Sequence, residues 1–266
     1  MANKKEGPKI LVFDIETSPI ISYTWGIWEQ NVALNQIKED WYVLAWAAKW
    51  LNEPASKIMY KDQRAEKKIS DDKKLMEGIW ALLDEADIVV TQNGKSFDVK
   101  KLNARFVMHG MTPPSSYRHI DTKVLAKKNF AFTSNKLEYM TDKLCTKYKK
   151  LSHKKFPGFS LWTECLAGNE DAWKEMEKYN KYDVLSLEEL YNVLAPWDNS
   201  INFAVYTGNN DLQFKCSCGS EKELYKKGFA YTATGKFQRS KCLDCGKQYQ
   251  DKQNLLSFEK RKSMKK

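Results

Sequence analysis

The sequence lacks any apolar run long enough to cross a membrane, because a spanning helix needs about 20 consecutive apolar residues. Its first residues, 1–9, are polar and rich in Lys, so the pattern of a secretory signal peptide is also missing. No internal repeat and no low-complexity segment is present, which excludes a repeat array. We therefore expect a soluble cytoplasmic protein with no membrane partner.

An even spread of cysteines, as in a secreted disulfide scaffold, is missing as well. Four of the six Cys cluster near the C-terminus, whereas Cys145 and Cys165 stand apart and are expected to be inert core thiols. Hydrophobic residues make up 42% of the 266 residues, enough for one large domain or for a medium domain with a small one. The aromatic content of 13% argues against a disordered chain.

Positive charge is concentrated in the last fifth of the chain. Residues 212–266 contain 14 Lys and Arg and five Asp and Glu, and so carry +9 of the formal net charge of +10. A basic segment favours a polyanionic partner, and nucleic acid is favoured over a membrane because no amphipathic anchor is evident. A tail that only increases solubility is the alternative.

Residues 10–17, Ile-Leu-Val-Phe-Asp-Ile-Glu-Thr, contain the pattern around which the chain is organised. The apolar first half is typical of a buried strand. Asp14 and Glu16 are two residues apart, so in a strand they point to the same face. Two close carboxylates repel each other, and a hard divalent cation such as Mg²⁺ relieves that repulsion. A metal site and an edge strand with two solvated acids both remain open at this point.

The pattern along the chain predicts strands first and helices later, hence an α/β or α+β layer with one mixed sheet. Three strands are expected after the first, as an antiparallel meander, at 20–31, 41–50 and 57–60. Later elements are expected as a helix at 70–87, a parallel strand at 87–91, and helices at 98–109, 120–140, 144–152 and 170–194. Ser70 is the expected N-cap of the first helix, with Asp71 and Asp72 in its first turn.

Two later acids lie where they could join the first pair. Asp98 opens a helix directly after a strand, and ligand sites in α/β sheets favour that edge, although a simple helix cap is the alternative. Tyr179 and Asp183 are four residues apart on the last helix, so they share a face with apolar neighbours. An acid there needs a partner such as a metal, although a surface Asp beside a half-buried Tyr is also common.

Taken in order, these segments resemble the three exonuclease motifs of the DEDD superfamily, which are 3′–5′ exonucleases on a ribonuclease H-like fold. The motifs are Phe-Asp-Ile-Glu-Thr at 13–17, Asn-x3-Phe-Asp at 93–98 and Tyr-x3-Asp at 179–183. The resemblance covers residues 9–195, and the superfamily includes the proofreading domains of DNA polymerases. Residues 93–105, and also 120–122, resemble the corresponding parts of the exonuclease domains of family B polymerases. It implies a mixed five-stranded sheet flanked by helices.

The third motif separates two branches of that superfamily. One branch has His five residues before the last Asp, where this chain has Lys178. The other has Tyr four residues before it, where this chain has Tyr179. The sequence therefore resembles the Tyr branch, often called DEDDy.

The resemblance implies two Mg²⁺ or Mn²⁺ ions, one to activate water and one to stabilise the leaving 3′ oxygen. The implied ligands are Asp14, which bridges both ions, Glu16 and Asp183, which complete the first site, and Asp98, which supports the second. Tyr179 would orient the attacking water, because a phenol with a pKa of about 10 stays protonated. Asn93 and the backbone near Thr17 are the expected contacts to the terminal nucleotide.

The clustered cysteines form a second candidate site. Cys216-x-Cys218 and Cys242-x2-Cys245 are separated by 23 residues, and each pair is followed by Gly. Two such pairs suit a tetrahedral Cys₄ site for one structural Zn²⁺. A ribbon this small has little core, so the metal would supply its folding free energy.

The segment around the second Cys pair resembles the zinc ribbons attached to transposases and other nucleic-acid proteins. A hairpin is expected at 231–238, with its turn near Gly235. Side chains suited to backbone contact and base stacking are Lys236, Arg239, Lys241 and Lys247 with Phe237 and Tyr249. A purely structural knuckle or a protein contact is the alternative.

The expected organisation is a disordered lead-in at 1–8, a ribonuclease H-like exonuclease domain at 9–197, a linker at 198–211, a zinc ribbon at 212–250 and a basic tail at 251–266. The expected activity is hydrolysis of DNA from the 3′ end, at single strands or frayed ends. A proofreading role would require a polymerase or another replication or repair protein as partner. A non-catalytic nucleic-acid adaptor, a structure-selective endonuclease and an RNA exonuclease remain alternatives.

Overall fold

The computed structural model describes residues 7–151, 155–206, 216–218, 220 and 222–264. Two compact units are present, Lys9–Tyr191 and a unit built mainly from Asn192–Lys266, and each is described by itself. Most of the predicted lead-in, part of the predicted linker and His153 lie outside the described residues. In the part of the chain that is described, no helix is both long and apolar enough to span a membrane.

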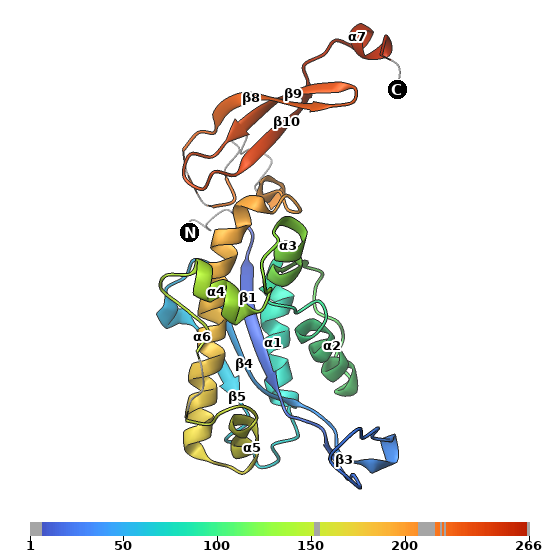
Figure 1. Cartoon of the computed structure of the whole chain (residues 1–266), viewed down its shortest axis with the longest axis vertical. Coiled ribbons are helices and arrows are strands. Elements are labelled where there is room, and N and C mark those ends of the chain that lie inside the picture. The colour runs from blue at the N-terminus through green and yellow to red at the C-terminus, as the bar shows by residue number, and fades with distance from the viewer. Residues whose placement is uncertain (1–6, 152–154, 207–215, 219, 221, 265–266) are drawn as a thin grey trace. The chain divides into compact units, whose positions relative to one another are not determined.

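The first unit is built on a sheet of five strands in the order β5-β4-β1-β6-β7. The strands are β1 (Ile10–Thr17), β4 (Val43–Trp50), β5 (Met59–Asp62), β6 (Ile88–Thr91) and β7 (Arg118–Asp121). Strand β1 lies in the middle, antiparallel to β4 and parallel to β6. The prediction of a mixed five-stranded α/β sheet is confirmed (Figure 1).

Helices cover both faces of this sheet. Because successive side chains of a strand point to opposite faces, alternate residues of β1 pack against different helices. Leu11, Phe13 and Ile15 belong to a buried cluster that includes side chains of α1 and α2. The intervening positions, Asp14 and Glu16, therefore face the opposite side. The helices are α1 (Lys73–Glu85), α2 (Asp98–Met108), α3 (Thr122–Asn129), α4 (Leu137–Leu144), α5 (Ser160–Leu166) and α6 (Glu170–Leu194).

The opposite side is covered by α5 and α6. Leu44 and Ala45 of β4 pack there against Leu161 of α5 and Trp173 of α6 in a second buried cluster. The long helix has the predicted bounds, and a 3₁₀ turn with Pro196 follows it. Short 3₁₀ turns lie at Leu34–Gln36, Ala55–Lys57, Ala195–Trp197 and Phe203–Tyr206.

The prediction of a strand over 20–31 is wrong. Only β2 (Ile21–Ser22) is extended there, and it pairs with β3 (Ile37–Glu39) in a separate two-stranded ribbon. The apolar residues between them are exposed and join no buried cluster among the described residues. Aromatic content alone predicted a strand, but no neighbour covers this one.

The prediction of helices over 120–140 and 144–152 is also wrong in its boundaries. Ile120 and Asp121 end strand β7, and the Asp121 carboxylate accepts hydrogen bonds from the backbone N–H groups of Lys123 and Val124. A helix must begin after such a cap, so α3 starts at Thr122. Residues 145–151 form no helix.

The N-cap residue of helix α1 is Asp72 and not the predicted Ser70. Asp72 is fully buried and receives hydrogen bonds from Arg105 at 2.6 Å, from His109 at 2.5 Å and from the backbone N–H of Val43 at 2.8 Å. An ionised acid tolerates such burial only when it is paired. Asp72 therefore connects α1, α2 and β4 through hydrogen bonds. The sequence predicted only that its charge would be favourable at the N-terminus of the helix.

The second unit contains a three-stranded antiparallel sheet in the order β10-β9-β8. Its strands are β8 (Tyr225–Thr232), β9 (Gly235–Lys241) and β10 (Gln248–Asn254), and a short helix α7 (Phe258–Lys262) follows. Thr232 pairs with Gly235 across the β8–β9 turn, so the predicted hairpin is confirmed.

Candidate active site and cysteine centre

Three of the four predicted acids meet at the carboxyl end of β1. Asp14 and Glu16 project from the strand, and Asp183 comes from the middle of α6. One carboxylate oxygen from each lies within 4.8 Å of the others. The strand alternation sends both β1 acids toward α6, and so brings together residues that are far apart in sequence.

Neighbouring side chains hold the two strand acids in place. The indole N–H of Trp162 on α5 donates to Oε2 of Glu16 at 3.3 Å. The amide of Asn180, one turn before Asp183, donates to Oδ2 of Asp14 at 2.7 Å. Sequence reasoning found neither residue, although Asn180 lies inside the Tyr-x3-Asp motif and could have been examined for that reason.

A lysine outside all three motifs also enters the cluster. The Lys150 ammonium donates to Oδ2 of Asp183 at 2.5 Å and lies 4.4 Å from the centre of the Tyr179 ring. Burial lowers the pKa of Lys150, but the charges of Asp183 and Tyr179 outweigh it and hold that pKa above its usual value. Sequence analysis did not identify Lys150 as a site residue, because it lies outside all three motifs.

The acids hold their protons more tightly than usual. Burial first, and then the charges of Asp98 and Asp183, raise the pKa of Asp14 well above its ordinary value. Burial, followed by the charge of Asp183, raises the pKa of Glu16 to about 8. Both shifts mean that burial and the neighbouring carboxylates disfavour the ionised forms of Asp14 and Glu16, and a bound cation would relieve that cost.

Asp98 lies beside this group without joining it. Its Oδ1 accepts the backbone N–H of Ile15, the residue between the two strand acids, at 3.3 Å. Burial raises the pKa of Asp98 to about 7, although the N–H groups of Ile15 and of Asp98 itself oppose the shift. This hydrogen bond holds Asp98 next to the part of β1 that carries the two strand acids. The charge of Asp98 also raises the pKa of Asp14.

Tyr179 lies one helical turn before Asp183 and is buried. Its ring meets Trp162 edge to face, with ring centres 6.2 Å apart. Burial, followed by the charge of Asp183, raises the pKa of its hydroxyl above the ordinary value. The phenol is therefore a proton donor at neutral pH and not a base.

Of the predicted nucleotide contacts, Asn93 lies in the loop between β6 and α2, and Thr17 is the last residue of β1. The Asn93 backbone has a φ of 67°, and its side-chain Oδ1 accepts from the Lys123 ammonium at 3.1 Å. Asp121 fixes the same loop by accepting the backbone N–H groups of Asn93 and Lys95. Thr17 lies at a register shift between β1 and β4, where the regular pairing ends.

Gly94 shows how tightly that loop is packed. A Cβ at this position would lie 2.2 Å from Oγ1 of Thr91. Any side chain would therefore displace the end of β6, which agrees with the predicted tight turn.

The donor set fits a hard divalent cation. One oxygen from each of three carboxylates lies within 4.8 Å of the others, close enough for the three groups to share one ion, and Mg²⁺ prefers oxygen ligands. Among the described side chains, Oδ1 of Asn180 is a buried oxygen for which no hydrogen-bond partner is found. Lys150 supplies one positive charge to the group, whereas the group has three carboxylates.

The four clustered cysteines also meet, in the second unit. Their sulfur atoms all lie within 4.8 Å of one another, with Cys216 and Cys245 3.5 Å apart and Cys218 and Cys242 3.7 Å apart. A tetrahedron of Zn–S bonds of about 2.3 Å has edges of about 3.8 Å, so these spacings fit zinc.

Backbone N–H groups in the turn at the second cysteine pair favour the thiolate form of Cys242. Gly246 has a φ of 78°, and its N–H donates to the Cys242 carbonyl at 3.0 Å. Burial raises the pKa of Cys242, but the backbone N–H groups of Cys245 and Asp244 outweigh it and lower that pKa to about 7.

Two residues predicted to contact nucleic acid lie beside the cysteine centre, Lys247 buried and Tyr249 half-buried. Lys247 is buried and donates to Oγ of Ser217 at 3.2 Å. The Tyr249 hydroxyl lies 3.1 Å from the sulfur of Cys216. Both support the cysteine centre, because a cation and a hydroxyl near thiolates offset their charge.

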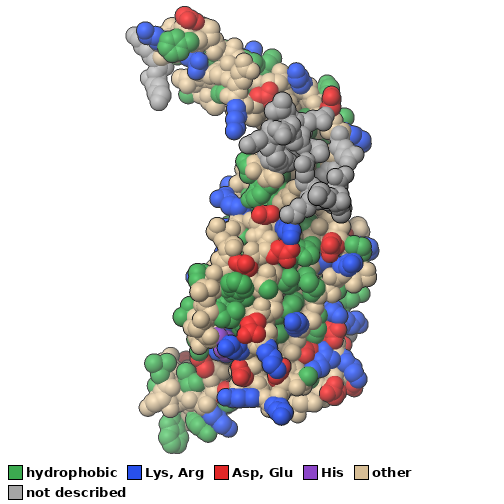
Figure 2. All heavy atoms as spheres, turned by 180° about the vertical axis from the view of Figure 1, so that it is seen from behind, with side chains coloured by type: hydrophobic (Ala, Val, Ile, Leu, Met, Phe, Trp, Pro, Cys, Tyr) green, Lys and Arg blue, Asp and Glu red, His purple; other side chains and the backbone are tan. Residues whose placement is uncertain are grey.

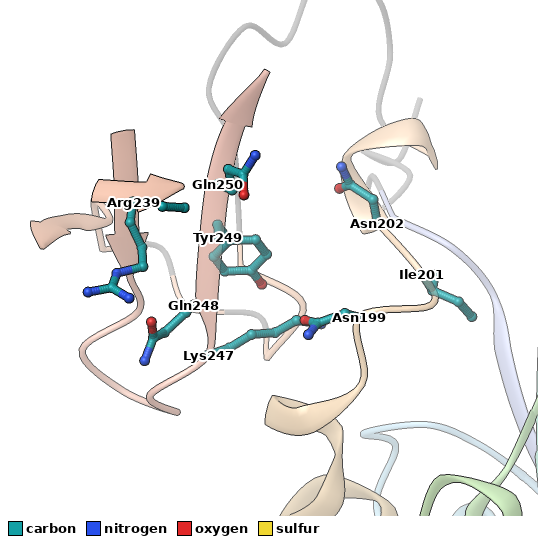
Figure 3. Close-up of a pocket in the computed structure, with 9 residues that line it drawn as sticks. Asn199, Ile201, Asn202, Arg239, Lys247, Gln248, Tyr249 and Gln250 are labelled. Carbon is teal, nitrogen blue, oxygen red and sulfur yellow. The ribbon is translucent and has the colours of Figure 1, made fainter. Parts of the chain in front are cut away.

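A hollow of about 400 Å³ opens beside Tyr249. Figure 3 shows that Arg239, Gln248 and Gln250 come from β9 and β10, while Asn199 and Asn202 come from the segment before the ribbon. The lining is rich in side-chain amides, which both donate and accept hydrogen bonds.

The other predicted ribbon contacts are partly exposed. The Lys236 ammonium lies 3.9 Å from the centre of the Phe229 ring, and Arg239 donates to the Lys227 carbonyl at 3.1 Å. Lys241 is partly exposed at the end of β9. Tyr231 of β8, which is exposed, was not predicted as a contact.

The family of the first unit follows from its sequence as well as from its fold. The chain belongs to the RNase H superfamily, whose model it matches over residues 11–195, and this class of fold carries metal-dependent nucleases. Among solved structures it is similar to the family B DNA polymerase from the hyperthermophilic archaeon Pyrobaculum calidifontis.

That similarity has 15% sequence identity and a TM-score of 0.52, and it covers 71% of this chain and 25% of the polymerase. The chain thus spans about a quarter of that polymerase, and the likeness is one of fold. No curated protein matches the chain.

Proposed function

We propose that this protein is a metal-dependent 3′–5′ exonuclease that hydrolyses DNA at single-stranded or frayed ends. The observation that carries the proposal is the convergence of Asp14, Glu16 and Asp183 within 4.8 Å on an RNase H superfamily fold. Three converging carboxylates, of which Asp14 and Glu16 have raised pKa values, favour a divalent cation, and such sites cleave phosphodiesters. The 3′–5′ direction comes from the resemblance of the motifs to those of the DEDDy exonucleases.

The residues that would hold Mg²⁺ or Mn²⁺ are Asp14, Glu16 and Asp183, with Asp98 as the acid nearest to a second position. When bound, such ions supply an activated water and stabilise the leaving 3′ oxygen. The second position is what the resemblance to the DEDDy exonucleases implies, and the charge interaction between Asp98 and Asp14 supports it.

The protein side chains would then position the substrate and the attacking water. The Tyr179 hydroxyl keeps its proton and can orient a water by hydrogen bonding. Trp162 and Asn180 fix the carboxylates of Glu16 and Asp14, so the acids need little rearrangement during the reaction. Asn93 and the backbone near Thr17 remain the proposed contacts to the terminal nucleotide.

We further propose that the ribbon binds one structural Zn²⁺ and retains nucleic acid through Lys236, Arg239 and Lys241. The support is the local charge, since residues 212–266 carry +9. Each phosphate contact would make binding weaken as salt rises.

The test is a time course on a 5′-labelled single-stranded DNA, its duplex and the RNA of the same sequence, with Mg²⁺ or Mn²⁺. Asp14→Asn is the inactive variant, and Asp71→Asn, an exposed acid in the same unit, is its matched control. We expect a ladder that shortens from the 3′ end in the wild type and in the control, and a rate at least about 10³-fold lower in Asp14→Asn.

Other outcomes identify the alternatives. Long internal fragments would indicate an endonuclease, and faster loss of the RNA would indicate an RNA exonuclease. Binding without cleavage in the wild type would refute the nuclease and leave the adaptor.

A further inference from the structure

Residues 20–37, here called the aromatic arm, contain many large apolar side chains that are exposed. The exposed fractions are 98% for Trp25, 80% for Trp28, 86% for Ile27, 87% for Leu34 and 65% for Tyr23. Isolated exposed apolar residues are ordinary, but a contiguous group of this size marks an interaction site.

The arm is held together by its own backbone and not by the core. Tyr23 and Gln36 are joined by a backbone hydrogen bond of 2.9 Å, and the Gln36 side chain bonds Ala33 and Tyr23. In Figure 1 the ribbon of β2 and β3 extends away from the central sheet, and Figure 2 shows hydrophobic side chains gathered at that projecting end.

The base of the arm is anchored firmly. Ser18 is buried and exchanges hydrogen bonds with Tyr42, from its N–H to the Tyr42 carbonyl at 2.8 Å and from the Tyr42 N–H to its hydroxyl at 2.9 Å. The Lys101 ammonium lies 3.5 Å from the centre of the Trp41 ring. A fixed base presents the tip in one place, which favours recognition over random exposure.

Charge decides between nucleic acid and protein as the occupant. Glu29 is the only charged residue in 20–37, and Lys38 in the rest of β3 is followed by Glu39, so this region has no excess of positive charge to neutralise phosphates. Nucleic-acid interfaces are strongly positive, whereas the centres of protein interfaces are rich in Trp and Tyr and poor in charge. The composition therefore favours a protein surface.

The exposed apolar area of the arm indicates which kind of protein would cover it. The three aromatic side chains, at about 150–250 Å² each, expose on the order of 500 Å², and the aliphatic side chains bring the patch close to the roughly 800 Å² that each partner contributes to a stable interface. Two copies of the arm would together bury a standard interface. With a single acid in each arm, like-charge repulsion between two copies is small.

The arm also offers backbone for such pairing. A two-stranded ribbon is marginal in water on its own, and the outer edges of β2 and β3 have no further strand in their sheet among the described residues. We propose that the aromatic arm is a dimerisation element that packs against the same arm of a second copy of this chain. Because β1 continues into the arm only a few residues after Glu16, the dimer would hold two acid clusters in one particle.

The test is sedimentation velocity of the full chain from about 1 to about 100 µM, at or above the weakest dissociation constants, on the order of 1 µM, of interfaces of this size. The variant is Trp25→Ser with Trp28→Ser. The matched control is Val107→Ser with Met108→Ser on α2, whose exposed fractions are 76% and 60%.

We expect the wild type and the control to sediment at twice the 31.0 kDa of the chain, and the arm variant to dimerise at least about 100-fold more weakly. All four positions are exposed, so thermal unfolding should be unchanged. A wild type that stays monomeric, or a dimer that survives in the arm variant, would overturn the proposal. A monomer whose affinity for labelled single-stranded DNA falls in the arm variant would show a nucleic-acid contact instead.

Discussion

The Lys150 ammonium and the Asp183 carboxylate form an ion pair of 2.5 Å inside the acid cluster, with Asp183 almost fully buried. The cluster thus has a cation of its own before any metal binds. Removing one partner of a buried pair leaves the other uncompensated, so this contact links the stability of the unit to its metal content.

Lys150→Met should therefore destabilise the metal-free protein. We expect a loss of about 2–3 kcal/mol in the free energy of unfolding, at the low end for a buried pair because Lys150 is about one quarter exposed. Mn²⁺ should restore most of it, since a divalent ion supplies the missing charge. Urea unfolding with and without Mn²⁺ measures both effects.

Lys149→Met is the matched control, because its partner Asp142 is at the surface and such pairs contribute little. Equal losses in the two variants, or a loss in Lys150→Met that Mn²⁺ leaves unchanged, would contradict the role of the buried pair.

Glu16 should make the stability of the metal-free protein depend on pH. Its carboxyl has a pKa of about 8 in the folded chain and an ordinary value of 4.5. Between these values the folded state binds more protons than the unfolded state, so the stability present at low pH is lost as pH rises. In EDTA, Glu16→Gln should match the wild type near pH 4.5 and melt on the order of 5 °C higher at pH 8.

The control for this prediction is Glu77→Gln, an exposed acid on α1. Melting temperatures that run parallel in Glu16→Gln and the wild type across the whole range would rule out the proton binding.

The cysteine centre should release one Zn²⁺ without disturbing the first unit. Cys216→Ser removes a ligand, so we expect metal analysis to show one zinc per chain in the wild type and a large loss in the variant. Eight of the nine Trp lie within residues 9–191, so Trp fluorescence reports on that unit and should melt unchanged. Cys145→Ser should keep its zinc, and loss of metal in this control would place the zinc elsewhere.

Asp72 offers a test of the fold that is independent of any ligand. Asp72→Ala removes the partner of Arg105 and leaves a buried guanidinium, which should cost about 3–5 kcal/mol in urea unfolding. Asp71→Ala, at an exposed position, should change stability by less than about 0.5 kcal/mol. Similar losses in the free energy of unfolding for Asp72→Ala and Asp71→Ala would mean that both acids act only through the helix dipole.

Much of the fold could be predicted from the sequence because local signals and tertiary structure agree. The strand β1 and the parallel strand before Asp98 are marked by short apolar runs, and the helix Glu170–Leu194 by its helical periodicity. The aromatic arm was misread for the opposite reason. Its residues favour a strand, but strand propensity reflects packing on a half-buried surface, and here no surface covers them.

The site could be predicted only as far as its motifs reach. Two acids in one strand and an acid one turn after a Tyr are visible in sequence, and the structure brings Asp14, Glu16 and Asp183 together. Lys150 and Trp162 come from irregular or short segments, and their positions depend on how the chain returns over the sheet. Lys247 looked like a surface cation because its burial depends on tertiary packing.

The central position of β1 has a further consequence. Strands paired on both sides open only when the whole unit opens, so their amides exchange with solvent at rates set by global unfolding. Two of the proposed catalytic acids sit on that strand and move only with it. A hydrolysis assay would therefore also report the folded fraction, and a substitution in the sheet that leaves Asp14, Glu16 and Thr17 in place would lower activity only when it lowers that fraction.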